Sequence, residues 1–294
     1  MSAVPNRARE FALLGLLALL WGSSYLLIRV ALETLPPLTL IAVRVSVAAL
    51  VLLAALAALR LRLPRGTAAW RALLAQAMLN SILPWTLLAW GQQTVASGLA
   101  GVLNSTSPLF VFLLMRFVTR HEAAGPLQLA GAVLGVAGVA LIVGAHALEG
   151  LGQAAAQLAI LAAALLYAFA AIYGRRHADT PPIVTAAGTL LWASVWLVPA
   201  SLLVDRPWTL SPSLASIGAA LALAVFGTAL ALMLYFRLVR TLGSMGVASQ
   251  SYLRAGVSVL LGAVILGERV DATTGAGLAA VVAGVAALNS RRPA

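Results

Sequence analysis

Residues 11–32 read FALLGLLALLWGSSYLLIRVAL, a run in which Arg29 is the one charged side chain. A helix of about 20 apolar residues spans the roughly 30 Å hydrocarbon core of a bilayer. The run is too long for the apolar core of a signal peptide, and no Ala-x-Ala cleavage pattern follows it. We therefore interpret residues 11–32 as a first, uncleaved membrane helix.

Further apolar blocks of similar length follow along the chain, separated by short loops. Their approximate ranges are 37–59, 72–91, 98–118, 126–145, 154–174, 182–203, 213–236, 246–266 and 274–290. The pairs Pro36-Pro37 and Pro181-Pro182 mark helix starts, where a missing N–H costs nothing. The triplet Leu242-Gly243-Ser244 is typical of a turn. The pattern predicts an all-α membrane protein with ten transmembrane helices.

The composition excludes most other classes of protein. The chain has 294 residues, of which 62% are hydrophobic and 9% charged, with a mean hydropathy of +1.00. A soluble domain carries about a quarter charged residues. The absence of Cys excludes disulfides and thiolate metal sites. The three His residues lie in or beside predicted loops without metal-ligand spacing, so we expect no metal and no cofactor.

The distribution of arginine predicts the orientation. All 19 basic residues are Arg and the net charge is +11. If the N-terminus is cytoplasmic, 14 of them lie in cytoplasmic segments and two, Arg206 and Arg269, on the opposite side. This bias predicts a multi-pass protein of the bacterial inner (plasma) membrane with both termini cytoplasmic. No basic stripe interleaves with aromatic residues, which excludes nucleic acid as a partner.

An internal repeat is visible when the sequence is shifted by 146 positions. The shift aligns Arg29 with Arg175 and Glu122 with Glu268, and Ala137-Gly138-Val139-Ala140 with 283–286. Residues 1–146 and 147–294 would then each hold five helices. Because five is odd, the second repeat enters the membrane inverted, as in transporters whose substrate site lies between two inverted repeats.

Several motifs carry a resemblance to a known family. They are Trp21-Gly22-Ser23-Ser24-Tyr25, Ala42-Val43-Arg44, Asn104-Ser105-Thr106-Ser107-Pro108-Leu109-Phe110 and Leu266-Gly267-Glu268-Arg269. The order and spacing of these motifs resemble those of the drug/metabolite transporter superfamily. In this resemblance, the chain consists of two EamA-type five-helix repeats. It most resembles the YddG type of amino-acid exporters. The resemblance implies a transporter without enzyme activity, which exports or facilitates passage of small metabolites, including aromatic amino acids, by alternating access.

Arg254 is the strongest candidate for a substrate contact. The family usually has Pro in helix 9, where this chain has Arg254-Ala255. With a helix start near Gly246, Arg254 lies about 12 Å into the membrane, where a charge costs at least about 2.5 kcal/mol. No Asp or Glu lies inside a predicted span to compensate it. We expect the guanidinium to meet a substrate carboxylate. The alternative is that it reaches the cytoplasmic interface or caps a broken helix.

Other polar and aromatic residues at mid-helix positions predict the walls of a central cavity. The candidate substrate-binding residues are Trp21, Ser24, Tyr25, Asn80, Trp85, Trp90, Asn104, Ser105, Tyr167, Gln250, Tyr252 and Arg254. Pro84 and Pro108 are candidate hinges, with static kinks as the alternative. Hydroxyl groups before Pro108 would otherwise bond the carbonyl that proline frees. We expect Arg29 and Arg44 to extend to the outer interface beside Glu33.

The missing membrane carboxylate predicts a neutral, zwitterionic or anionic solute that moves without a proton relay. Alternatives are export of hydrophobic or nucleotide-sugar-like metabolites, a membrane-embedded lipid enzyme using His121-Glu122, and a structural or sensory protein. Small residues in helices 5 and 10, such as Gly131 and Gly277, predict close helix packing or a dimer contact. The expected partners are a small-molecule substrate and the lipid bilayer, with a monomer or a homodimer as the assembly.

Overall fold

The computed structural model describes residues 7–118, 126–147, 151–177, 179–248 and 250–288, and within these ranges every regular element is a helix. The first five predicted spans correspond to the elements α1 (Arg7–Ala31), α2 (Pro37–Ala58), α3 (Thr67–Ala77), η1 (Met78–Ile82), α4 (Leu83–Gly91), α5 (Ser97–Asn104), α6 (Ser107–Leu113), η2 (Leu114–Val118) and α7 (Pro126–Ala147). The second five correspond to α8 (Leu151–Tyr173), η3 (Gly174–His177), α9 (Pro182–Val204), η4 (Pro207–Thr209), α10 (Leu214–Ala224), η5 (Val225–Leu230), α11 (Ala231–Ala248), α12 (Gln250–Leu266) and α13 (Ala272–Leu288).

Eight helices of the described residues are long and apolar enough to cross a membrane. The two C-terminal helices, α12 and α13, have 17 residues each, which corresponds to about 26 Å at 1.5 Å per residue. The structure thus confirms the helical class and eight membrane-capable helices. The full count of ten crossings, the inverted repeats and the cytoplasmic termini stay predictions.

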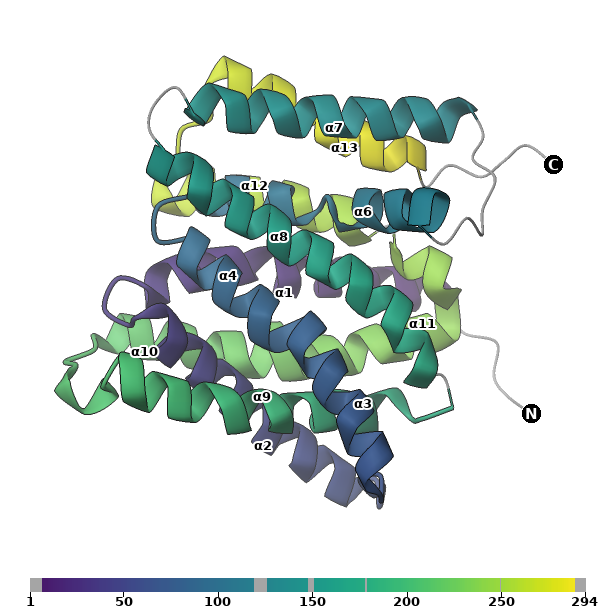
Figure 1. Ribbon diagram of the computed structural model, residues 1–294, viewed down its shortest axis with the longest axis vertical. Helices are drawn as coiled ribbons and strands as arrows, with labels where there is room; N and C mark the ends of the chain where they lie inside the picture. The colour runs from purple at the N-terminus through teal and green to yellow at the C-terminus, as the bar shows by residue number, and fades with distance from the viewer. Residues whose placement is uncertain (1–6, 119–125, 148–150, 178, 249, 289–294) are drawn as a thin grey trace.

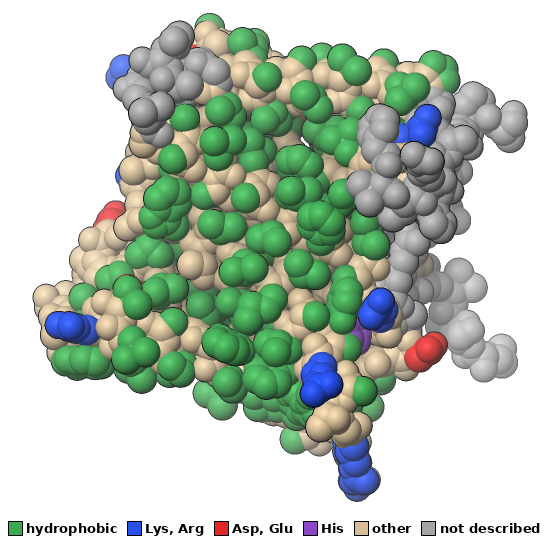
Figure 2. Space-filling view, viewed as in Figure 1, with side chains coloured by type: hydrophobic (Ala, Val, Ile, Leu, Met, Phe, Trp, Pro, Cys, Tyr) green, Lys and Arg blue, Asp and Glu red, His purple; other side chains and the backbone are tan. Residues whose placement is uncertain are grey.

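The helices pack side by side in one bundle, with the N and C marks on the same side (Figure 1). α7 lies along α13 over most of its length, and α2 packs against α9. α1 packs against α12, α10 and α11, while α8 packs against α4, α5 and α6. Hydrophobic side chains cover the middle of the visible face, and charged side chains lie toward its edges (Figure 2). This surface suits a lipid environment.

Close approach of α7 and α13 depends on the small residues that the sequence singled out. A Cβ added at Gly284 would lie 2.6 Å from the carbonyl oxygen of Gly131, and one at Gly138 would lie 2.7 Å from that of Gly277. Both clashes are with backbone, which cannot move aside. The structure therefore confirms the packing role of this stripe in α7 and α13.

Two spans are interrupted at the predicted prolines. A π-helical turn, η1, directly precedes Pro84, the second residue of α4. α5 ends at Asn104, and Pro108 is the second residue of α6. The Ser107 hydroxyl donates to the carbonyl of Asn104 at 2.9 Å, the carbonyl that proline four residues later leaves free. A further π-helical segment, η5, interrupts the eighth span without any proline.

The boundary between the eighth and ninth spans differs from the prediction. The turn expected at Leu242-Gly243-Ser244 is wrong, because α11 runs without interruption from Ala231 to Ala248. α12 begins at Gln250 rather than near Gly246. Glycine in a helix costs only about 1 kcal/mol, so tertiary packing overrides this weak turn signal. Arg254 consequently lies in the second turn of α12, about 6 Å from its start.

Cross-helix polar contacts join the ends of the helices on the predicted outer side, by which we mean the side of residues 32–36, 92–96, 205–213 and 267–271. The Glu268 carboxylate accepts from the backbone N–H groups of Ser97 at 2.6 Å and Gly98 at 2.9 Å. Asp205 accepts from the backbone N–H of Thr39 at 2.7 Å. Both carboxylates thus satisfy amide groups at helix N-termini, where negative charge is favoured.

Arg29 also belongs to this set of contacts. Its Nη1 donates to the carbonyl groups of Gln92 at 2.9 Å and Gln93 at 2.8 Å, just after α4. The expected pairing with Glu33 is not among the ion pairs of the described residues. A guanidinium beside the free carbonyl groups of a helix C-terminus is favourable. Arg29 therefore fastens α1 to α4, a structural role.

Candidate functional site

Arg44 of α2 is buried, with 6% of its surface exposed. Its Nε donates to the hydroxyl of Thr228 in η5 at 2.9 Å, and its Cζ lies 3.9 Å from the ring centroid of Trp85 in α4. The expectation that Arg44 extends to the outer interface is therefore wrong. An acceptor and an aromatic face lie within the bundle, so the side chain gains more by staying inside.

Two tyrosines and an asparagine lie beside this guanidinium. Tyr25 of α1 is buried, and its hydroxyl accepts from Nδ2 of Asn104 at 2.6 Å. Trp85 is a hydrogen-bond partner of the Tyr167 side chain in α8, and Tyr167 packs against the hydrophobic core that includes Tyr25. The structure thus brings four predicted residues together, Tyr25, Trp85, Asn104 and Tyr167, around an arginine that was expected elsewhere.

Arg254 approaches the same group from α12. Its carbonyl oxygen lies 3.0 Å from the position that a Cβ at Gly22 of α1 would take, three residues before Tyr25. Its Nε is buried without a hydrogen-bond partner, while the residue as a whole is half-buried. Arg237 pairs with Glu10 elsewhere in the bundle, and neither Arg44 nor Arg254 has a carboxylate partner among the described residues. We call the combined set the guanidinium cluster: Arg44, Arg254, Tyr25, Trp85, Asn104, Tyr167 and Thr228.

Two hydroxyl groups expected in the cavity, those of Ser24 and Ser105, donate hydrogen bonds to carbonyl groups of their own helices. Ser24 donates to the carbonyl of Leu20 at 2.9 Å, and its Oγ lies against Gly227, where an added Cβ would come within 2.7 Å of it. Ser105 donates to the carbonyl of Gly101 at 2.8 Å. Each hydroxyl group thus donates its proton to a carbonyl group of its own helix, as is common for Ser and Thr in helices.

Trp21 lies in a second hydrophobic cluster rather than in the guanidinium cluster. Its ring is 5.4 Å from that of Tyr235 in α11, among Leu13, Leu20 and Leu234. Trp90 is 47% exposed near the end of α4, a position that suits the membrane interface. Neither residue contributes to the cluster around Arg44.

The remaining predicted residues are placed less directly. Asn80 is half-buried within η1, next to the break that precedes Pro84. Gln250 and Tyr252 lie in the first turn of α12, and their side chains are outside the described residues. The pair His121-Glu122, the alternative for an enzyme, also lies outside the described residues. Hinge motion at the two prolines stays a prediction.

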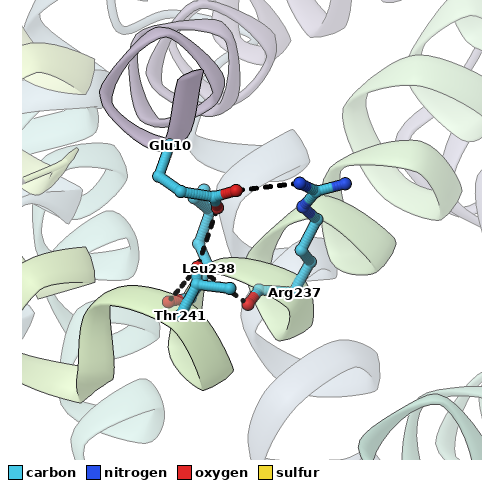
Figure 3. A network of polar contacts seen from close by, with 4 residues as sticks. All are labelled: Glu10, Arg237, Leu238 and Thr241. Carbon is cyan, nitrogen blue, oxygen red and sulfur yellow. Dashed lines mark hydrogen bonds and ion pairs between the residues drawn. The ribbon is translucent and has the colours of Figure 1, made fainter. Parts of the chain in front are cut away.

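A carboxylate inside α1 corrects one sequence inference. We expected no acidic residue within the spans, but α1 begins at Arg7 and includes Glu10, which is 2% exposed. Glu10 accepts from Nη2 of Arg237 at 2.8 Å and from the hydroxyl of Thr241 at 2.8 Å (Figure 3). Because Glu10 lies in the first turn of α1, it joins the N-terminal end of that helix to α11 and does not compensate the charge of Arg44 or Arg254.

The described residues contain no group of three or more His, Asp or Glu side chains arranged to hold a metal ion. Sequence reasoning missed Thr228 and the burial of Arg44. The sequence did contain a signal for the burial of Arg44, since its depth in α2 is comparable to that of Tyr25 in α1. Nothing in the sequence around Thr228 distinguishes it from other hydroxyl residues. The cluster offers two positive charges, aromatic surface and one amide to a ligand.

Comparisons with known proteins give a consistent picture. The model of the EamA-like transporter family matches twice, over residues 10–144 and 154–290. The chain is similar to an uncharacterized inner membrane transporter of Escherichia coli K12, YedA, with 31% identity over 88% of this chain and 83% of that one. It is also similar to an uncharacterized transporter of Bacillus subtilis, YvbV, with 26% identity over 100% and 95%. One solved crystal structure, 20% identical, shares the fold with a TM-score of 0.67 over 96% of this chain and 98% of that one.

Proposed function

Because the chain belongs to the EamA-like transporter family, we propose that it exports or facilitates passage of small carboxylate-bearing metabolites, above all amino acids including aromatic ones. It is a membrane transporter, and its relative in Escherichia coli is named an inner membrane transporter. The multi-pass helical structure agrees with that location. The finer likeness to amino-acid exporters of the YddG type is part of the proposal.

One observation carries the substrate class: the Nε of Arg254 is buried and has no hydrogen-bond partner among the described residues. A positive charge within a bundle needs compensation, since an isolated buried ion costs several kcal/mol. A guanidinium fork fits a carboxylate with two parallel hydrogen bonds. A substrate carboxylate would supply both the charge and the acceptor, and it would leave with the substrate. An acid from the protein would instead occupy the fork permanently.

The alternating-access part of the proposal is supported by the twofold family match and by the packing pattern. The family model matches each half of the chain once. Under the 146-residue shift, the contacts of α1 with α12 correspond to those of α8 with α6, the contacts of α1 with α11 correspond to those of α8 with α5, and the pair α7 and α13 corresponds to itself. The π-helical segments η1 and η5 also occupy equivalent positions. Such a symmetric arrangement allows the two repeats to exchange roles between inward-open and outward-open states.

A ligand panel in detergent tests this function. Purified protein is heated with L-phenylalanine, L-leucine, L-glutamate, a nucleotide sugar and a cationic dye, and the unfolding temperature is recorded. A ligand that binds only the folded protein raises this temperature. We expect an amino acid to stabilise the wild type and Arg269→Gln, which changes an exposed loop residue, but not Arg254→Gln. Stabilisation by the nucleotide sugar or the dye alone would contradict the proposal.

A further inference from the structure

Asn104 is the last residue of α5, at the break in the fourth span, and 2% of its surface is exposed. Its Nδ2 donates to the hydroxyl of Tyr25 at 2.6 Å, and this bond fixes the orientation of the amide. Its Oδ1 is buried and has no hydrogen-bond partner among the described residues. An acceptor that has lost water without gaining a partner is costly. This oxygen is therefore suited to a donor that arrives with a ligand.

The packing of α5 against α12 shows which part of α12 lies opposite Asn104. A Cβ added at Gly262 would lie 3.0 Å from the Ser97 hydroxyl at the start of α5, and one added at Gly101 would meet the side chain of Ser258. The paired positions thus move backward by one turn along α12 while they move forward by one turn along α5, so the two helices are antiparallel. Continued by one more turn, this register brings Asn104 opposite the turn of α12 that precedes Ser258.

That preceding turn of α12 contains Arg254, and the contacts of α1 give it the same depth. The carbonyl oxygen of Arg254 lies 3.0 Å from the position of a Cβ at Gly22, which is one turn before Tyr25, the partner of Asn104. The Nε of Arg254 is a charged donor without a partner, and the Oδ1 of Asn104 is a neutral acceptor without one, among the described residues. At one depth, the bundle thus offers partners for both ends of a zwitterion.

From this arrangement we propose that Asn104 distinguishes amino acids from other carboxylates, because its Oδ1 accepts a hydrogen bond from the α-ammonium group while the carboxylate is bound at Arg254. The inference rests on the proposed function and deepens it. An ammonium group that leaves water needs an acceptor in the bundle. An amide oxygen supplies one without a charge of its own. An aspartate at this position would instead pair with the guanidinium in the empty site.

The test compares ligands that differ by one amino group. Dissociation constants in detergent are measured for L-phenylalanine against 3-phenylpropionate, and for L-leucine against 4-methylpentanoate. One hydrogen bond between a charged group and a buried partner corresponds to about a tenfold change in affinity or more. We therefore expect the amino acid of each pair to bind the wild type about tenfold more tightly than its deaminated analogue. L-3-phenyllactate, whose neutral hydroxyl replaces the ammonium group, should bind with an intermediate affinity.

Asn104→Leu keeps the approximate size of the side chain and removes the acceptor. In this variant the ratio of the two dissociation constants should fall to about one, because binding of the amino acid weakens while that of the deaminated acid stays nearly unchanged. A purely structural role of Asn104 would weaken both ligands equally and leave the ratio as it is. Gln93→Leu is the matched control, since it removes an exposed amide just after α4, and it should keep the wild-type ratio.

The outcomes separate this inference from the proposed function. If L-phenylalanine and 3-phenylpropionate bind the wild type equally, and both depend on Arg254, the inference is overturned and the proposed function stands. If neither binds, both fail. An undiminished ratio in Asn104→Leu would also overturn the inference. If that variant does not fold, the wild-type ratio stays decisive and Tyr25→Phe is the second variant. It removes the hydroxyl that orients the amide, so the ratio should fall in part, and an undiminished ratio there would overturn the inference.

Discussion

Replacing Glu268 by Gln should loosen the predicted outer side of the bundle. Glu268 belongs to the Leu266-Gly267-Glu268-Arg269 motif and lies just after α12. Its two carboxylate oxygens accept from the first backbone N–H groups of α5, at Ser97 and Gly98. One side chain therefore connects the end of α12 to the start of α5, in the region where the two halves of the chain meet.

The size of the effect follows from these two bonds, which measure 2.6 and 2.9 Å. A hydrogen bond to a charged group is worth about 1.5–3 kcal/mol and one to a neutral group about 1 kcal/mol. Gln keeps one carbonyl oxygen and turns an NH₂ group toward the second N–H. Loss of the charge also removes a favourable interaction with the helix N-terminus. We expect a net destabilisation of about 2 kcal/mol for Glu268→Gln and more for Glu268→Ala.

Thermal unfolding of the purified protein in detergent measures this cost. A loss of about 2 kcal/mol corresponds to a decrease of about 3–6 °C in Tm for a chain of this size. Glu33→Gln is the matched control, because Glu33 is an exposed acid in another loop on the same side. Equal Tm values for Glu268→Gln and Glu33→Gln would refute the reasoning, because the contact of Glu268 with α5 would then contribute no more to stability than an exposed side chain does.

Three further changes test other parts of the structure. Thr228→Val removes the acceptor of the buried guanidinium in α2 and should lower Tm by several degrees in the same assay, while a Thr228→Ser variant should retain most of the stability. Gly284→Ala places a methyl group against backbone of α7 and should reduce the yield of folded protein in size-exclusion chromatography, whereas Gly15→Ala, which meets nothing within 4 Å, should not. Glu10→Arg and Arg237→Glu should each lower Tm. The double variant should recover part of the loss, because it restores the ion pair with the two charges exchanged. No recovery would show that the pair does not join α1 to α11.

Apolar periodicity was sufficient to predict most of the helices. The blocks around residues 37–59 and 182–203 match α2 and α9 closely, because Pro37 and Pro182 fix their first turns. Proline also predicted the breaks in the third and fourth spans. The break at η5 contains no proline and was missed, because π-helical segments have no strong local signature. The end of α11 was misplaced, since glycine alone is a weak breaker.

The kinds of residue in the candidate site were predictable from the sequence, but the contacts between them were not. Tyr25, Asn104 and Tyr167 were expected to line the cavity, and the structure joins Tyr25 to Asn104 by a hydrogen bond, while their role in binding stays a prediction. The direction of Arg44 was not predictable, because its acceptor, Thr228, is 184 residues away in the chain. Depth within a helix gives the cost of a charge but not which neighbour compensates it. Glu10 was overlooked because it directly precedes the apolar run, and α1 extends one turn further than that run.

The central claim is that the chain moves a carboxylate-bearing solute through contact with Arg254. Counterflow in proteoliposomes tests it most directly: vesicles are loaded with an unlabelled amino acid, and uptake of the labelled form is followed with time. We predict transient accumulation with the wild type and with Arg269→Gln, and none with Arg254→Gln. Equal accumulation with Arg254→Gln, or no counterflow of any carboxylate by the wild type, would contradict the account.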